Sequence, residues 1–566
     1  MSIPRPEHPR PQFERQNWQN LNGRWDFEFD NQNSAIDRGL YKNDAVLSQK
    51  ITVPFCPESK LSGLAHTDFI NGCVYRREFD IPAEWLDGAT VLHFGACDYI
   101  ATVFVNEQEV GRHIGGYVSF EFDISDYVKE GKNTLSVVVK DDTRDEMIPS
   151  GKQCFKYESF GCHYTRTTGI WQTVWVENMP KEHIISTRYY TDIHTGTLTV
   201  IAKVKGVAPL TVKALYKGEE MGIATALPQG ETVTVSIPLK EKHLWEIGNG
   251  RLYDLQLTYG EDAVKSYFGL REVSLNGYKF MLNGKSVYLR TVRDQGFYPD
   301  GIYTAPTDAD LEKDIQMALD CGFNGARPHE KIFEERYFYY ADKMGYLTFG
   351  EYPDWSLNHT KPQSVYHILP EWLEEIERDF NKPSIIGWCP HNEAWGPTYH
   401  EGLRLVYLAT KAADLTRPCI DSSGGGHVQT DIYDSHYYAA TVEEFKNAYD
   451  GIKDGQYKEV CPGCVNLLEY KKDIPFFVSE YGGIAFNRDG TGWGCGDTPQ
   501  TEDDVIARFK AQTEYLLGND HICGLCYTQL TDVEQEQNGL YYYDRTPKFN
   551  NEKFKAILTQ KAAIED

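Results

Sequence analysis

The stretch that decides the fold reads Thr307-Asp-Ala-Asp-Leu-Glu-Lys-Asp-Ile-Gln-Met-Ala-Leu-Asp-Cys-Gly-Phe-Asn-Gly-Ala-Arg327. Its first and fourth residues have the spacing of a capping box, which marks the start of a helix. Apolar residues then recur every three or four positions from Leu311 to Leu319, and Gly322 is placed to end the helix. The segment Phe323–Arg327 follows at once, so the stretch predicts a helix that leads directly into a strand.

The same alternation of helix and strand continues through the second half of the chain. Strand candidates there are 287–291, 323–327, 346–350, 385–389, 419–422, 432–436, 476–479 and 524–528. Strands that alternate with helices form parallel sheets, and eight such strands predict a (β/α)₈ TIM barrel.

The first half of the chain has short alternating runs and few helical windows. Runs such as Val91–Phe94 predict a jelly-roll β-sandwich in residues 1–182. A second all-β stretch, residues 183–273, has the length of an immunoglobulin-like β-sandwich. The predicted fold class is therefore multidomain β plus α/β, with the C-terminal TIM barrel in residues 274–566.

The charge composition disfavours two kinds of partner. The chain has 57 Lys and Arg against 83 Asp and Glu, a net charge of −26, and no basic run stands out. Such a surface repels nucleic acids and anionic lipids. No apolar stretch reaches the length of about 18 residues that a membrane helix needs. We therefore expect neither nucleic acid nor a membrane as partner.

Cysteine usage and the amino terminus predict a cytoplasmic protein. The 13 Cys residues are dispersed, and the first residues lack an apolar signal-like segment. Two pairs, Cys461-Pro-Gly-Cys464 and Cys523-Gly-Leu-Cys526, have a spacing that can hold zinc. The second pair lies in an apolar run typical of a strand, where residues three apart face opposite sides. We therefore expect no metal site and reduced thiols.

In a TIM barrel the functional residues follow the carboxyl ends of the strands. That position holds charged and polar residues in this sequence, namely Arg327, His329, Glu351, Glu393, His436, Glu480 and Gln529. Glu393 and Glu480 follow the apolar strands four and seven. Glycosidic cleavage needs two such carboxylates, because one protonates the leaving oxygen and the other attacks the anomeric carbon or activates water.

Each carboxylate, taken alone, is also compatible with an ordinary ion pair, but the pair with its polar neighbours favours catalysis. Arg327 would keep Glu480 ionised. Trp388 and Trp395 flank Glu393, and partial desolvation by these rings would raise the pKa of its carboxyl. The residues therefore favour Glu393 as the acid.

These motifs resemble glycoside hydrolase family 2, which includes β-galactosidases, β-glucuronidases and β-mannosidases. Ser384-Ile-Ile-Gly-Trp-Cys-Pro-His-Asn-Glu-Ala-Trp-Gly396 resembles the acid/base segment of the family, and Pro475-Phe-Phe-Val-Ser-Glu-Tyr-Gly482 resembles its nucleophile segment. Further similar motifs are Leu21–Phe27, Tyr75–Phe79, Val103–Asn106, Gly169–Gln172, Phe268–Arg271 and Leu282–Lys285. The resemblance therefore covers essentially the whole chain.

The resemblance implies a retaining exo-β-glycosidase with Glu393 as general acid/base, Glu480 as nucleophile and a sugar-binding type of jelly roll. It implies that Asn392 bonds the hydroxyl beside the anomeric carbon and that Tyr437 lies near the nucleophile. Further implied wall residues of the sugar site are Arg327, His329 and Trp493. The implied partner is a small carbohydrate or glycoside, no cofactor or metal is needed, and a homo-oligomer would be usual for the family.

Departures from the family pattern bear on the sugar. Arg293-Asp-Gln-Gly296 stands where large β-galactosidases have Asn-Arg-His-Glu, so Asp294 and Gln295 would supply polar contacts in place of that His. β-Glucuronidases carry Asn-x-Lys after strand eight, whereas Gln535–Gly539 has no Lys. Asp532, Glu534 and Glu536 would also repel a uronate. We therefore expect a neutral sugar, with galactose first.

Several alternatives remain open from the sequence. Within the family they are β-glucosidase, β-mannosidase, arabinosidase and β-glucuronidase, and a transglycosylase would use the same residues. A non-catalytic carbohydrate-binding protein is disfavoured, because binding alone does not need paired carboxylates. The loop Phe486–Gly496 is expected to overhang the site.

Overall fold

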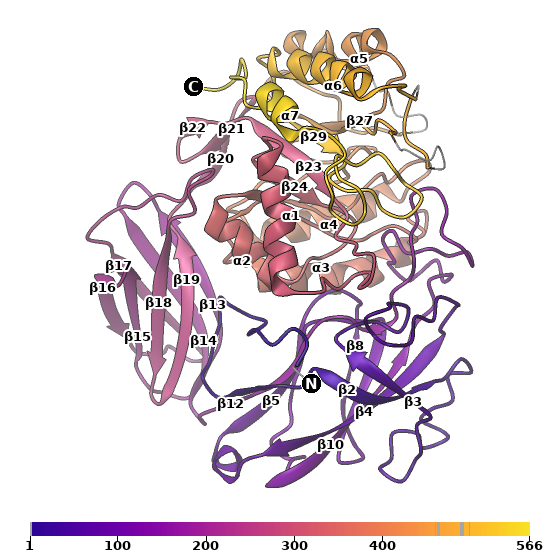
Figure 1. Cartoon of the computed structure of the whole chain (residues 1–566). Helices are drawn as coiled ribbons and strands as arrows, with labels where there is room; N and C mark the ends of the chain where they lie inside the picture. The colour runs from indigo at the N-terminus through magenta and orange to yellow at the C-terminus, as the bar shows by residue number, and fades with distance from the viewer. Residues whose placement is uncertain (1–2, 459, 461–463, 487–491, 497) are drawn as a thin grey trace.

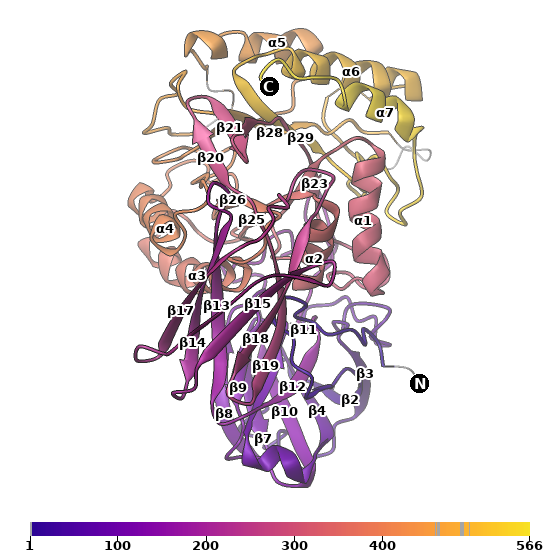
Figure 2. The same ribbon diagram turned by 90° about the vertical axis from the view of Figure 1, so that its left-hand side faces the viewer.

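The computed structural model describes residues 3–458, 460, 464–486, 492–496 and 498–566. Figure 1 shows a β-sandwich at the bottom, a second β-sandwich at the left and the barrel with its helices above them. In Figure 2, turned by 90°, both sandwiches lie below the barrel. The predicted multidomain β plus TIM-barrel fold is confirmed.

The first sandwich consists of two antiparallel sheets, of orders β1-β12-β5-β9 and β3-β2-β4-β10-β7-β8, and its short strands β6 and β11 form a separate two-stranded sheet. Alternate residues of its strands, such as Leu135 and Val137, are fully buried between the sheets. The strands are β1 Trp18–Asn20, β2 Gly23–Phe29, β3 Gln49–Val53, β4 Gly72–Ile81, β5 Ala89–Phe94, β6 Cys97–Asp98, β7 Ile100–Val105, β8 Gln108–Ile114, β9 Phe120–Asp123, β10 Gly131–Lys140, β11 Gly169–Ile170 and β12 Val174–Met179.

The second sandwich pairs the sheets β13-β14-β17 and β16-β15-β18-β19. Its core is formed by inward residues such as Val200 and Leu255. The strands are β13 His183–Asp192, β14 Thr197–Lys205, β15 Leu210–Tyr216, β16 Glu219–Ala226, β17 Thr232–Pro238, β18 Leu252–Tyr259 and β19 Asp262–Gly269. The gap between β12 and β13 lies near the predicted boundary at residue 182, although the exact domain bounds stay a prediction.

A small sheet, β20 Val273–Asn276, β21 Lys279–Leu282 and β22 Lys285–Ser286, leads into the barrel. The barrel strands are all parallel and have the order β26-β25-β24-β23-β29-β28-β27. They are β23 Leu289–Asp294, β24 Gly325–Pro328, β25 Leu347–Glu351, β26 Ile385–Cys389, β27 Tyr433–Tyr437, β28 Phe476–Gly482 and β29 Ile522–Thr528.

The fifth predicted strand, 419–422, is not a regular strand. It runs parallel to β26 through single bridges, and the Ile420 N–H donates to the Trp388 carbonyl at 2.9 Å. The Asp421 carboxylate accepts the backbone N–H groups of Val428 and Gln429, at 2.6 and 2.9 Å, so the chain turns into a loop instead of extending the ladder. An irregular segment therefore occupies the fifth barrel position.

The helices cover the outside of the barrel (Figure 1). They are α1 Asp308–Asp320, α2 Glu335–Met344, α3 Val365–Asp379, α4 His400–Ala413, α5 Val442–Tyr449, α6 Glu502–Leu517 and α7 Asn551–Leu558. The capping box at the start of α1 is confirmed, because the Thr307 N–H donates to Asp310 Oδ2 at 2.9 Å. Among the described residues, no helix combines the length and apolar character of a membrane span.

Candidate active site

Two arginines from the barrel converge on the carboxylate of Glu480. Glu480 lies in β28 and is 1% exposed. Arg293 Nη1, from β23, donates to Glu480 Oε2 at 2.9 Å, and Arg327 Nη1, from β24, donates to Oε1 at 3.0 Å. All three side chains come from the carboxyl-terminal parts of parallel strands, so they meet inside one mouth.

These arginines keep Glu480 ionised. Burial alone would raise its pKa, but attraction to the charged groups of Arg293 and Arg327 outweighs burial and holds the pKa of the Glu480 carboxyl well below its ordinary range. Arg327 was expected in this role. Arg293 lowers this pKa more than Arg327 does, and it was not among the expected site residues.

A tyrosine hydroxyl also donates to Glu480, and it belongs to Tyr438. Tyr437, the residue expected there, packs edge-on against Tyr449 of α5 with 6.4 Å between ring centroids. Successive strand residues face opposite sides of a sheet, so His436 and Tyr438 point into the barrel while Tyr437 points out. The expected role of Tyr437 is therefore wrong by one residue.

Glu393 follows β26 and faces Glu480 across the mouth. A carboxylate oxygen of each glutamate and a ring nitrogen of His436 all lie within 4.8 Å of one another. His436 Nδ1 is 2.7 Å from Glu393 Oε1, and its Nε2 is 3.2 Å from Arg327 Nη1. Because a guanidinium can only donate, Nε2 accepts and Nδ1–H donates to Glu393.

The backbone around Glu393 is held in an unusual conformation. Its φ is +53°, a left-handed value that is uncommon for residues other than glycine. Its N–H donates to the Ser423 carbonyl at 2.7 Å, and the preceding Asn392 N–H donates to Asp354 Oδ1 at 2.8 Å. Backbone strain that surrounding contacts maintain is frequent at functional sites. Ser423, which directly follows the irregular fifth segment 419–422, thus helps to position Glu393.

The Asn392 side chain is oriented toward a ligand by Arg327. Arg327 Nη2 donates to Asn392 Oδ1 at 2.6 Å, which directs Nδ2 elsewhere. Asn392 is 1% exposed, and within the described part of the chain its Nδ2 has no hydrogen-bond partner. A buried amide donor without a partner is costly, so this position fits a sugar hydroxyl.

His329 is placed beside Glu480 by Glu351. Its Nδ1 lies 2.8 Å from Glu351 Oε1, and its Nε2 lies 3.9 Å from Glu480 Oε1. Burial and three nearby cations lower the pKa of His329 well below its ordinary value. The ring is therefore neutral, its Nδ1–H donates to Glu351, and Nε2 is left as an acceptor in the mouth.

The acidic loop after β29 is electrostatically compensated. Arg293 Nη2 donates to Glu536 Oε1 at 3.0 Å, and the Tyr164 hydroxyl of the first sandwich donates to the other oxygen. Lys548 Nζ donates to Asp532 Oδ1 at 2.5 Å. The expected repulsion of a uronate by these two carboxylates is therefore largely cancelled.

Asp294 does not face the mouth. Its carboxylate accepts the Gly296 N–H at 3.0 Å and lies 3.5 Å from the hydroxyl of Tyr337, a residue of α2. Alternation along β23 puts Arg293 inward and Asp294 outward, toward the helices. The expected substrate contact of Asp294 is therefore wrong.

Gln529 and Trp493 lie around Glu536. Gln529 accepts from Gln295 Nε2 at 2.9 Å and donates to Asn538 Oδ1 at 2.7 Å. Trp493 Nε1 donates to the Gly161 carbonyl at 2.7 Å, which ties its loop to the first sandwich. Residues 487–491 of the expected overhanging loop lie outside the described residues. Substrate contact by Gln529 and Trp493 stays a prediction.

Trp388 turns away from Glu393. Its Nε1 donates to Asp414 Oδ2 at 2.8 Å, and its ring meets Trp372 of α3 edge-on. The expected desolvation of Glu393 by Trp388 is therefore wrong, because this ring lies on the outer face of β26. Trp395 is 49% exposed and donates to the Gly424 carbonyl.

Glu393, His436 and Glu480 each offer an atom that could bind a metal ion. However, both oxygens of Glu480 already accept from guanidinium groups, and His436 Nδ1 donates a proton. This arrangement suits proton transfer better than cation binding. Of the possible zinc thiols, Cys461 lies outside the described residues, whereas Cys464 is disulfide-bonded, contrary to the expected reduced state.

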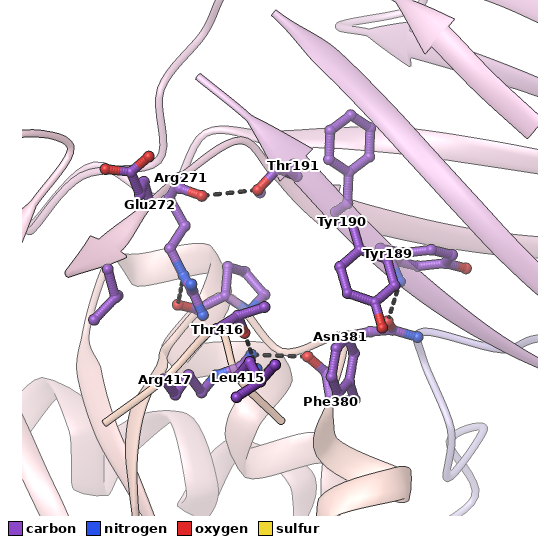
Figure 3. A pocket seen from close by; sticks show the side chains of 14 residues that line it. Tyr189, Tyr190, Thr191, Arg271, Glu272, Phe380, Asn381, Leu415, Thr416 and Arg417 are labelled. Carbon is purple, nitrogen blue, oxygen red and sulfur yellow. Dashed lines mark hydrogen bonds between the residues drawn. The ribbon is translucent and has the colours of Figure 1, made fainter. Parts of the chain in front are cut away.

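A separate cavity of about 280 Å³ lies between the second sandwich and the barrel (Figure 3). Its Arg271 donates to the carbonyls of Pro383 and Ile385, at the amino end of β26, whereas Glu393 follows the other end. Thr191 Oγ1 likewise donates to the Arg271 carbonyl. These polar groups satisfy one another, so the cavity is a junction between domains rather than the active site.

Comparison with known proteins identifies the family of both main parts. The model of the glycosyl hydrolases family 2 sugar binding domain matches residues 18–179, and that of the family 2 TIM barrel domain matches residues 273–561. A putative β-glucuronidase of Formosa agariphila is 28% identical over 73% of this chain and 50% of its own length. A β-glucuronidase of Streptococcus agalactiae is 23% identical over 95% and 96%, and a β-galactosidase of Thermoanaerobacterium thermosulfurigenes is 25% identical over 73% and 58%.

The chain thus spans half the length of the Formosa relative. Among solved structures, the β-glucuronidase of Ruminococcus gnavus in complex with D-glucuronic acid has the same fold. It matches with a TM-score of 0.80 at 21% identity, over 96% of this chain and 98% of that one. Since the barrel model alone matches more than half of the residues, the chain belongs to glycosyl hydrolases family 2.

Proposed function

We propose that this family member is a retaining exo-β-glycosidase acting on a terminal β-linked sugar. The observation that supports this most is that one carboxylate oxygen of Glu393 and one of Glu480 lie within 4.8 Å of each other. Retaining glycosidases hold their carboxyl groups about 5–5.5 Å apart, whereas inverting enzymes need about 6.5–9.5 Å to admit a water molecule. The observed approach fits direct attack by Glu480.

In the first step a Glu480 oxygen bonds to the anomeric carbon while the bond to the leaving oxygen breaks. The proton of Glu393 moves to that leaving oxygen. In the second step Glu393 takes a proton from water, whose oxygen bonds to the anomeric carbon and releases Glu480. Asn392 Nδ2 would donate to the adjacent sugar hydroxyl through both steps.

For the sugar, β-galactoside remains our first candidate and β-glucuronide becomes the second. Cancellation of the charges of Asp532 and Glu536 by Lys548 and Arg293 weakens the case against a uronate. Relatives named β-glucuronidase and β-galactosidase are both found at 22–28% identity. The absence of Lys from Gln535–Gly539 still counts against the uronate.

A panel of nitrophenyl glycosides tests the proposed function. It should contain the β-galactoside, β-glucoside, β-mannoside, arabinoside and β-glucuronide, and we expect turnover of at least one. Proton NMR of the first product should show the β-anomer before mutarotation, and an α-anomer formed first would contradict retention. Added methanol separates the outcomes further, because a methyl glycoside as the main product would indicate transglycosylation.

Replacing Tyr438 by Phe removes a donor from Glu480, and we expect kcat/KM to fall about 10- to 100-fold, the usual range for a hydrogen bond to a charged group. That hydrogen bond also helps to lower the pKa of Glu480. Its loss raises this pKa, so the acidic limb of the kcat/KM profile should move to higher pH. Tyr437→Phe is the matched control, since its ring faces α5. Equal effects of the two substitutions would argue against this role for Tyr438.

A further inference from the structure

A buried lysine from the first sandwich lies at the mouth of the barrel. Lys152 is 2% exposed, and its Nζ sits over the ring of Trp355, 3.2 Å from the centroid. Within the described part of the chain, its ammonium donates no hydrogen bond and has no carboxylate oxygen within 4.0 Å. The Trp355 ring offsets part of the cost of burying this charge, but a ring face leaves ammonium N–H donors without an oxygen acceptor, so the position can take an acceptor that is not part of the protein.

The segment that carries Lys152, residues 150–165, is fixed on the barrel. The Ser150 N–H donates to the Trp355 carbonyl at 3.0 Å. Gly151 has a φ of +53° and approaches Glu330 so closely that an added Cβ would lie 2.3 Å from the Glu330 carbonyl oxygen. Together with the Tyr164–Glu536 contact, these features hold Lys152 in one place relative to the catalytic residues.

Lys152 belongs to the surroundings of both catalytic carboxylates. It is the charged group that most lowers the pKa of His329, whose Nε2 lies 3.9 Å from Glu480 Oε1. Trp355, which lies under its ammonium, donates from Nε1 to the Asn392 carbonyl at 3.2 Å, one residue before Glu393. The lysine and the tryptophan thus form one wall beside the neutral acceptor of His329.

Two acidic residues next to the Lys152–Trp355 contact, Glu330 and Asp354, each accept a hydrogen bond from a group other than Lys152. Glu330 Oε2 accepts the Trp355 backbone N–H at 3.1 Å. Burial and the charge of Asp354 raise the pKa of Glu330 well above its ordinary value, although the charge of Lys152 acts in the opposite direction. Asp354 accepts from Asn392 and lies 2.8 Å from His359 Nε2. Neither carboxylate contacts Lys152, so its donors are available to a ligand.

We propose that Lys152 is a substrate-binding residue whose ammonium donates to an oxygen of the terminal sugar, either a hydroxyl or a carboxylate. The inference rests on the proposed function, because it needs a sugar seated against Glu480. The inference assigns part of the sugar site to the first sandwich. The residues at the ends of the barrel strands do not indicate this, because Lys152 lies outside the barrel.

The test compares Lys152→Met with Lys156→Met on the full glycoside panel. Lys156 is a matched control, because it lies in the same segment and its Nζ is 3.8 Å from the Phe160 ring centroid, but it is exposed. We expect kcat/KM for the best substrate to fall about 10- to 100-fold in Lys152→Met and to stay unchanged in Lys156→Met. Lys152→Gln, which keeps a donor, should recover part of the loss.

The panel also shows whether the sugar oxygen that Lys152 binds belongs to a carboxylate or to a hydroxyl. If Lys152 binds a carboxylate, the β-glucuronide is the best substrate and Lys152→Met lowers its turnover while any neutral glycoside is spared. If it binds a hydroxyl, a neutral glycoside is best, and a substrate lacking that hydroxyl loses nothing further in Lys152→Met. Because this deoxy substrate can be measured on the wild-type protein, the contact stays testable should Lys152→Met fold poorly.

Failure of the inference differs from failure of the proposed function. A wild-type protein that hydrolyses a glycoside while folded Lys152→Met keeps its kcat/KM overturns the role of Lys152 alone. Equal losses in Lys152→Met and Lys156→Met would also overturn it. A wild-type protein that hydrolyses none of the glycosides overturns the proposed function, whatever the Lys152 variants do.

Discussion

Glu480→Gln should abolish turnover, with kcat on the best glycoside falling by about 10⁴-fold or more, because no other group can form the covalent intermediate. The neutral amide is close in shape, so Arg293 and Arg327 can still contact it, but it cannot attack the anomeric carbon. The measurement is steady-state release of nitrophenol, together with the melting temperature to show that the variant is folded. Glu401→Gln is a suitable control, since Glu401 is an exposed residue of α4 that pairs with Arg404 at 3.1 Å.

Covalent labelling by a fluorinated sugar gives a second test of Glu480 as the nucleophile. A dinitrophenyl glycoside with fluorine beside the anomeric carbon slows both steps, while its good leaving group lets the first outrun the second. Wild-type protein should therefore gain the mass of one fluorosugar on the peptide that contains Glu480, and Glu480→Gln should gain none. A label on Glu393, or turnover by Glu480→Gln close to that of the wild type, would refute the nucleophile assignment.

The sequence predicted the barrel and the meeting of Glu393 and Glu480 in its mouth, because both depend on local patterns. Each glutamate follows an apolar segment, and the carboxyl ends of parallel strands meet wherever the sheet closes. The prediction of a regular fifth strand at 419–422 was wrong. Its residues have strand-like composition, but Asp421 draws the backbone of Val428 and Gln429 into a loop, a contact that no periodicity shows.

The errors at Tyr437 and Asp294 have one physical origin. A strand shows side chains to alternate faces, so the inward residue depends on where the strand ends, and a sequence pattern leaves that uncertain by one position or more. The inward neighbours are Tyr438 and Arg293. At both positions the adjacent residue has the side chain that contacts Glu480.

The contacts between domains could not be predicted in this way. Tyr164 and Glu536 are 372 positions apart, and their contact depends on how the first sandwich packs on the barrel. Lys152 is close to Trp355 for the same reason. The placement of Glu393 and Glu480 therefore follows from short motifs, whereas the contacts of Tyr164 and Lys152 with the barrel arise only in the folded chain.

Glu393→Gln should lower kcat/KM about 10²- to 10⁴-fold on a glycoside whose leaving group needs a proton, the usual range for loss of a general acid. His436, which holds Glu393 through Nδ1, remains in place and can contact the amide. A dinitrophenyl glycoside leaves without protonation, so its first step should be nearly unaffected and an initial burst of phenolate should precede slow release of the sugar. An equal loss on both kinds of substrate would contradict the acid role.

Added azide tests Glu393 as the base of the second step separately from its role as the acid of the first step. It attacks the anomeric carbon without needing a base, so Glu393→Ala, which leaves space beside Glu480, should turn over faster with added azide and give a β-glycosyl azide. The wild-type protein should respond little, because Glu393 already activates water and its charge repels the anion. An α-glycosyl azide, or no acceleration in Glu393→Ala, would mean that Glu393 does not act on the face of the sugar opposite Glu480.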